Sequence, residues 1–94
     1  MKITIKIPKD FDFEIELSQI RNYVVDHKWK HYPFREGAEK FQSPKYEYAF
    51  AIIPTTDKIY DIEYCIFSLV QFLANVEGVG IEEMITLITK KKYD

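Results

Sequence analysis

Two histidines, His27 and His31, stand four residues apart in a segment that the sequence predicts to be the end of a helix. At this spacing two imidazoles share one helical face and can bind the same metal ion. Lysines flank both residues, however, and Asp26, the nearest carboxylate, projects from a different face. We therefore expect the pair to form the polar end of an amphipathic helix, and we predict no metal and no other cofactor.

The residue types that act as nucleophiles or as acid–base groups lack the surroundings that catalysis needs. The single cysteine, Cys65, falls within an apolar helix face, which favours a buried and inert thiol. The paired carboxylates Glu82 and Glu83, like Asp57 and Asp61, lie at predicted helix starts, where the helix dipole accounts for them. No P-loop, GxGxxG or HExxH motif occurs. We predict that the protein is not an enzyme and has no small-molecule substrate.

The polar face of the helix predicted at about 57–77 carries almost no charge. A solvated helix face normally collects Lys and Glu, whereas tyrosines and neutral hydrogen-bonding residues are typical of protein interfaces. The candidate interface residues are Tyr60, Tyr64, Ser68, Gln71 and Asn75. Alternatively, the last helix or residues 33–45 cover this face. We expect a non-catalytic interaction or regulatory module that binds a protein partner or forms a homodimer.

A basic and aromatic segment, residues 28–46, offers an alternative function. It interleaves cations with rings, as surfaces that bind single-stranded nucleic acid do. The candidate binding residues are Lys28, Trp29, Lys30, Arg35, Lys40 and Lys45. In the opposing interpretation the rings pack in the core and the lysines face solvent, since the five cations are spread over the whole of residues 27–46. Weak binding of single-stranded nucleic acid is therefore the alternative prediction.

The helix predicted at about 57–77 is the element around which the others must pack. Its apolar residues fill an arc of roughly 220° at the helical spacing, far wider than a surface helix needs. The middle of this arc contains Ile59, Ile62, Ile66, Leu69, Leu73 and Val76. With 94 residues, of which 47% are hydrophobic, the chain can form one domain (1–94) with a single core.

Residues 1–17 alternate between apolar and polar side chains and predict a β-hairpin that turns at residues 8–10. This register pairs Ile5 with Phe13 on one face, and Lys2 with Glu16 and Lys6 with Asp12 on the other. Hydrophobic pattern and charge select the same register, because a one-residue slip would expose the apolar set.

The remaining patterns predict two further helices and one further strand. One helix begins after an N-cap at Ser18 and ends before Pro33, a strand covers residues 46–53, and the last helix begins at Ile81. The order is then β-β-α-β-α-α, with residues 33–45 as a loop or helical turn. The predicted fold is α+β, with a mainly antiparallel three-stranded sheet in the order 2-1-3 and a central strand at 46–53.

Net charge and hydropathy indicate where the protein is expected to reside, but they say little about its function. The net charge is −2, but residues 27–46 hold five cations and two carboxylates, whereas residues 47–89 hold one cation and seven carboxylates. This polarity by segment neither requires nor excludes a class of partner. No apolar run approaches membrane-spanning length, so we predict no membrane partner. A single cysteine is typical of a reducing compartment, and cytoplasmic localisation is the expectation.

Overall fold

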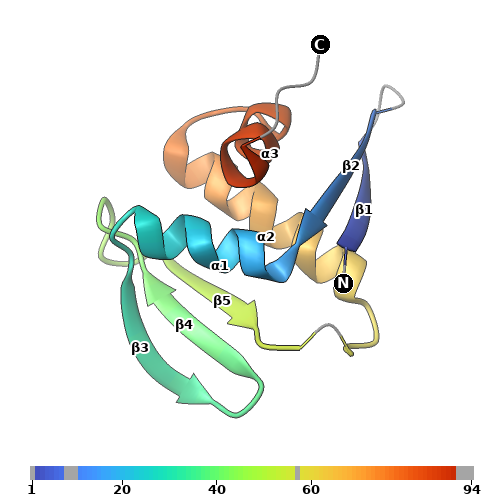
Figure 1. The fold of residues 1–94 in the computed structure, drawn as a ribbon. Coiled ribbons are helices and arrows are strands. Elements are labelled where there is room, and N and C mark those ends of the chain that lie inside the picture. Colours follow the sequence, from blue (N-terminus) through green and yellow to red (C-terminus); the bar gives the residue numbers. More distant parts are fainter. Residues whose placement is uncertain (1, 8–10, 57, 91–94) are drawn as a thin grey trace.

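The computed structural model of the chain describes residues 2–7, 11–56 and 58–90, with side chains for residues 14–56 and 58–90 (Figure 1). Strands and helices follow one another along the chain in an α+β arrangement. They are β1 (Lys2–Ile7), β2 (Phe11–Glu16), α1 (Leu17–Asp26), β3 (Lys30–Arg35), β4 (Ala38–Gln42), β5 (Phe50–Pro54), α2 (Ile62–Glu77) and α3 (Ile81–Thr89).

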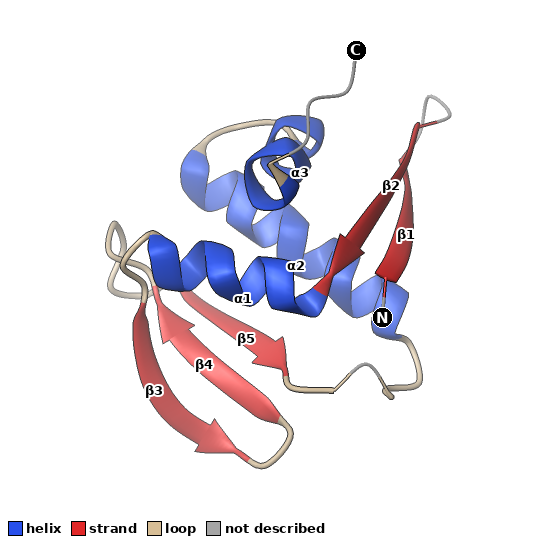
Figure 2. Ribbon diagram, viewed as in Figure 1, coloured by secondary structure: helices blue, strands red, loops and turns tan. Residues whose placement is uncertain are grey.

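The strands form two separate antiparallel sheets (Figure 2). Strands β1 and β2 make a two-stranded hairpin, and the other sheet has the order β3-β4-β5. The predicted α+β class with a three-stranded antiparallel sheet is confirmed. The arrangement differs from the predicted order 2-1-3, because β5 pairs with β4 and the described part of the N-terminal hairpin stays a sheet of its own.

The N-terminal hairpin has the predicted register. The pairs include Lys2 with Glu16, Ile5 with Phe13 and Lys6 with Asp12. Opposite charges are thus directly across from each other, which stabilises this register over its neighbours. The predicted turn at residues 8–10 and the predicted burial of Ile5 and Phe13 lie outside what the structure describes.

Helix α1 is shorter than predicted. Its N-cap is Glu16 rather than Ser18, because the Glu16 N–H donates a 2.8 Å hydrogen bond to Gln19 Oε1 in a capping box. The helix ends at Asp26, and Lys28 then adopts a φ of +66°, a left-handed conformation that a continuing helix does not allow. The chain leaves the helix here and continues as strand β3.

Residues 33–45, expected to be a loop or helical turn, contain most of a second hairpin. Strands β3 and β4 turn at Glu36 and Gly37, and Gly37 has a φ of +89° that glycine adopts without strain. The observed order therefore contains two strands, β3 and β4, that the predicted order β-β-α-β-α-α lacks.

The strand predicted at 46–53 appears as β5, shifted toward residues 50–54. Ala51 and Ile53 are buried on the side that contacts helices α1 and α2, whereas Phe50 and Ile52 point to the opposite face. The small side chain of Ala51 and the branched side chain of Ile53 allow α1 and α2 to approach the strand closely. Strand β5 is an edge strand of the described sheet, however, and not the central strand that we expected, because it stands last in the order β3-β4-β5 and pairs with β4 alone.

Helix α2 forms the centre of the core, as predicted. Ile66, Val70 and Leu73 are completely buried, and Figure 1 shows α1 and α2 on the same side of the three-stranded sheet. The helix starts at Ile62, after an N-cap at Asp61, and not near residue 57. Its opposite face stays open because the sheet and α3 do not surround it.

Helix α3 follows α2 at an angle of 100° and packs against both α1 and α2. Its buried side consists of Met84, Ile85, Ile88 and Thr89, and its start at Ile81 is as predicted. Within the described ranges, no single helix is long and apolar enough to cross a membrane, and only α2 and α3 taken together, despite the bend, reach that length and composition.

Candidate functional site

The five predicted interface residues are exposed. Tyr60 lies just before α2, and Tyr64 (68% exposed), Ser68, Gln71 and Asn75 follow along the helix. We call these five residues the neutral face. In the described part of the chain, neither α3 nor residues 33–45 cover it, so the alternative in which the fold buries this face is excluded there. Its role in binding stays a prediction.

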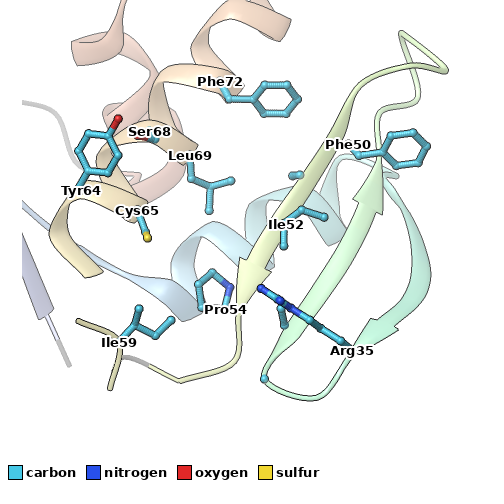
Figure 3. Close-up of a pocket in the computed structure, with 13 residues that line it drawn as sticks. Arg35, Phe50, Ile52, Pro54, Ile59, Tyr64, Cys65, Ser68, Leu69 and Phe72 are labelled. Atoms are coloured by element: carbon cyan, nitrogen blue, oxygen red, sulfur yellow. The ribbon is translucent and has the colours of Figure 1, made fainter. Parts of the chain in front are cut away.

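The neutral face borders a groove between α2 and β5 (Figure 3). The larger hollow of this groove has a volume of about 450 Å³. Residues of α2 form one wall, and Leu69 and Phe72 extend from it toward β5. The edge of strand β5 forms the other wall, where Phe50, Ala51, Ile52 and Pro54 line the hollow even though the Phe50 and Ile52 side chains lie on the sheet face away from the helices. The groove is therefore lined mainly by apolar side chains.

A second hollow of about 370 Å³ adjoins the first, because Phe72 lines both. Its other walls are Asn75 and Val76 of α2 and the loop that carries Tyr46 and Tyr48. The rings of these two tyrosines lie 5.6 Å apart, and both are exposed. Together the two hollows extend the groove along most of α2.

Arg35 is the charged side chain among the described residues that line the larger hollow. It reaches toward Pro54, at the end of β5 (Figure 3). Its guanidinium lies 5.3 Å from the centre of the Phe34 ring, and no carboxylate among the described residues forms an ion pair with it. One end of an apolar groove thus carries an available positive charge.

Cys65 lines the same hollow and is partly exposed, so its predicted position in the core is incorrect. Cys65 lies in the first turn of α2, on the side that faces the groove. Burial, and then the carboxylate of Asp61, raise the pKa of the Cys65 thiol; Sγ lies 3.8 Å from Asp61 Oδ1. A thiol that stays protonated at neutral pH is a poor nucleophile.

The fold separates the six residues of the basic and aromatic segment. Trp29 is 5% exposed and its ring lies 6.3 Å from that of Phe72, so it belongs to the core. Lys45 forms an ion pair with Glu77 at 3.1 Å, and Lys28 lies in the turn after α1. These three are not gathered at one surface.

The other three cations gather on the outer sheet face, the side of the three-stranded sheet away from the helices. We define this face by Lys30, Tyr32, Phe34, Arg35, Lys40 and Phe50. Lys40 Nζ lies 4.4 Å from the centre of the Phe50 ring and 5.9 Å from that of Phe34. Lys30 Nζ lies 5.1 Å from the Tyr32 ring. Cations and accessible rings are therefore combined on one surface.

The two histidines do not share a helical face, because the helix ends before His31. His27 caps α1, with Nδ1 2.8 Å from the Tyr23 carbonyl oxygen and its ring stacked on Tyr23. His31 lies on β3, where Nε2 is 3.2 Å from Glu39 Oε2. In the ranges that the structure describes, no three His, Cys, Asp or Glu residues are placed to hold a metal ion.

Sequence reasoning missed the β5 wall of the groove and its neighbours on α2. The small residues Ala49 and Ala51 on one face of the strand predicted at 46–53 indicate that a helix packs there, and both are buried, but nothing in the sequence indicates that α2 leaves a groove along the edge of this strand. Leu69 is buried in the core, as its position in the apolar arc predicts, but it also lines the groove, and Phe72 beside it is only partly buried. The only available signal was the great width of that arc, which exceeds what the core uses.

Comparison of the chain with protein-family models, curated proteins and solved structures gave no match.

Proposed function

We propose that this protein is a non-catalytic interaction module with a regulatory role, which binds a protein partner or a second copy of itself through the neutral face and the adjoining groove. The observation that carries this proposal is an exposed, uncharged, tyrosine-bearing helix face beside an apolar groove. We expect the module to act in the cytoplasm, because a single cysteine suits a reducing compartment.

The composition of this surface favours association with another protein. Tyr60 and Tyr64 offer large rings whose immobilisation costs little conformational entropy. Ser68, Gln71 and Asn75 lose their hydration at lower free-energy cost than charged side chains do. Beside them, the apolar lining of the groove would gain about 25 cal/mol for each Å² removed from water.

The test is the molar mass in solution, measured by size-exclusion chromatography with light scattering over a range of concentrations. The double variant Tyr64→Lys with Gln71→Lys places like charges on both copies, so it should convert a dimer to a folded monomer. The matched control adds the same two charges to the exposed side of α1, as Asn22→Lys with Val25→Lys, and should leave the dimer intact.

A dimer that the Tyr64 and Gln71 changes leave unaffected would exclude the neutral face as the dimer interface. If the wild-type protein is monomeric at all concentrations, self-association is ruled out. The partner is then a different protein, and the same two variants test its binding. Circular dichroism confirms that each variant is folded before its mass is interpreted.

A second candidate function is weak binding of single-stranded nucleic acid by the outer sheet face. The observation that favours it is the position of Lys30 and Lys40 over the rings of Tyr32 and Phe50. Rings that stack on bases and cations that contact phosphates are the two components of such surfaces. Oligonucleotide binding that depends on Lys30, Arg35 and Lys40 would support this function.

A further inference from the structure

Among the strands that the structure describes, none pairs with the edge of β5 opposite β4. The hydrogen bonds from Ser43 N–H to the Ala49 carbonyl (2.9 Å) and from Thr55 N–H to the Gly37 carbonyl (3.0 Å) frame its pairing with β4. In an antiparallel pair, every second residue directs both backbone groups to the neighbouring strand. The backbone groups of Ala51 and Ile53 therefore face β4, and those of Phe50, Ile52 and Pro54 face away.

The outward backbone groups are the N–H and carbonyl of Phe50, the N–H and carbonyl of Ile52, and the carbonyl of Pro54. Among the described residues, none of these five groups has a hydrogen-bond partner. They leave two donors and three acceptors along a short stretch of chain. An added strand satisfies such an edge and gains main-chain hydrogen bonds in doing so.

The open edge faces the groove described above. Figure 3 shows α2 standing alongside β5, with Leu69 and Phe72 directed into the space between them. Every second side chain of a strand added to β5 would face α2 and this apolar wall, because side chains alternate along a strand. Strand addition needs two components, and both are present here. The unpaired backbone groups of β5 can form main-chain hydrogen bonds that give affinity, and the apolar wall of α2 can select the side chains of the added strand.

We propose that the groove binds an extended peptide segment of a partner protein, which adds to β5 as a further strand. The segment has apolar side chains at alternate positions and a carboxylate at the Pro54 end, where Arg35 is available. This inference rests on the proposed protein-binding function and states which kind of partner the site takes. A carboxylate fits because guanidinium groups form strong, charge-assisted hydrogen bonds with it.

A second copy of this chain fits the same edge less well. If two β5 strands pair antiparallel about Ile52, Phe50 of one copy lies opposite Pro54 of the other. Arg35 at the Pro54 end would then approach Lys40, whose Nζ lies 4.4 Å from the Phe50 ring centre. Like charges at both ends oppose this pairing, whereas a carboxylate-bearing peptide removes the conflict.

The experiment begins with a displayed library of random dodecapeptides, selected on the immobilised full-length protein. We expect enriched peptides with alternating apolar residues and an Asp, Glu or terminal carboxylate. One enriched peptide is then synthesised with a fluorescent label, and its Kd is measured by anisotropy. If no peptide is enriched, or if the enriched peptides lack this pattern, the inference is overturned.

Backbone methylation of the labelled peptide tests strand addition directly. Replacing an N–H that faces β5 by N–CH₃ removes one hydrogen bond and adds a clash, so we expect a loss of at least roughly tenfold in affinity. Methylation at the intervening positions, which face away from β5, should change the affinity by no more than about threefold on the same scale. If methylation at adjacent positions lowered the affinity equally, rather than at every second position, pairing of the peptide with β5 would be contradicted.

Variants of the protein at Ile52 and Arg35 test the same contacts by changing the protein instead of the peptide. Ile52→Pro removes an outward N–H without removing a bond to β4, and edge strands accept proline at such positions. It should weaken peptide binding at least roughly tenfold, whereas Ile52→Val keeps the N–H and should bind nearly as well as wild type. Arg35→Gln should weaken carboxylate-bearing peptides but not their amide analogues. If Arg35→Gln weakened the carboxylate-bearing peptides and their amide analogues equally, Arg35 would not bind the carboxylate.

The outcomes separate this inference from the proposed function. If Tyr64→Lys with Gln71→Lys abolishes peptide binding but Ile52→Pro and backbone methylation do not, the neutral face binds partners without strand addition. If peptides bind as described while the wild type is monomeric, both proposals stand with a heterologous partner. A further outcome is that an oligonucleotide competes with the peptide, and that replacing Lys30, Arg35 and Lys40 by Gln abolishes the binding of both ligands. In that case the outer sheet face is the shared binding site and strand addition is wrong.

Discussion

Arg21 Nε donates a 2.8 Å hydrogen bond to Glu39 Oε1 and so joins helix α1 to strand β4. Glu39 also lies 3.2 Å from His31 Nε2, so one carboxylate contacts side chains from two elements. The hydrogen bond and the charge of Arg21 hold the pKa of Glu39 below its ordinary value of 4.5, although partial burial opposes the shift. This contact connects the helical layer to the sheet that carries the groove.

The first prediction follows from this ion pair. A carboxylate with a lowered pKa stabilises the folded state at pH values above 4.5, and the contribution is lost as the pH falls through the folded-state pKa. Arg21→Gln should therefore reduce the free energy of unfolding by about 0.2–1 kcal/mol at pH 7, since Arg21 is half exposed. Urea unfolding at pH 7 and pH 3 measures the difference between wild type and variant, which should shrink at pH 3. A difference that does not change with pH would contradict the role of Glu39.

The second prediction concerns the centre of the core. Ile66 is completely buried, so Ile66→Ala should leave a cavity and lower the free energy of unfolding by about 2–5 kcal/mol. Ser68→Ala, two residues along on the exposed face, should change it by less than about 0.5 kcal/mol. Chemical denaturation measures both. A loss of less than about 1 kcal/mol for Ile66→Ala would mean that α2 is not the central helix.

The third prediction uses Cys65 as a probe of the groove. Because its pKa is raised, less thiolate is present at pH 8 than for a free cysteine, and alkylation should be correspondingly slow. Asp61→Asn removes the negative charge that opposes ionisation and should accelerate alkylation at pH 8. Mass spectrometry follows the reaction cleanly because the chain has a single cysteine. Equal rates for wild type and variant would show that Asp61 does not influence the thiol.

The fourth prediction separates nucleic-acid binding from protein binding. If the outer sheet face binds single strands, replacing Lys30, Arg35 and Lys40 together by Gln should abolish the affinity and flatten its dependence on salt. The control replaces three cations elsewhere, as Lys28→Asn, Lys58→Gln and Lys90→Asn, and should retain most of the affinity. Anisotropy of a labelled oligonucleotide at low salt measures both. Undetectable binding by the wild-type protein would end this interpretation.

The hairpin register and the course of α2 could be predicted because each depends on a strong local pattern. Alternation over residues 1–17 and the matched charges Lys2–Glu16 and Lys6–Asp12 permit one register, and the structure has it. The apolar arc of α2 likewise predicted its buried residues, such as Ile66 and Leu73. In both elements the residues that become buried recur at the regular spacing of a strand or a helix, so the sequence alone identifies them.

Strands β3 and β4 could not be predicted in the same way. Five of the six residues of β3 are exposed, so no apolar alternation marks it. The helical pattern of residues 20–32 continues past the point where Lys28 turns left-handed, and only tertiary contacts show that the helix has stopped. The neutral face was found from its composition, whereas the groove beside it depends on where β5 lies, which no local pattern encodes.

The open edge of β5 has a consequence for the solubility of the protein. An apolar edge strand is a template for intermolecular pairing and fibril growth, and Phe50, Ala51, Ile52 and Ile53 form such a segment. Pro54 ends the run without an N–H, and α2 stands beside the edge and obstructs the flat stacking of successive sheets. We therefore expect that conditions which widen the space between α2 and β5 promote aggregation through this edge.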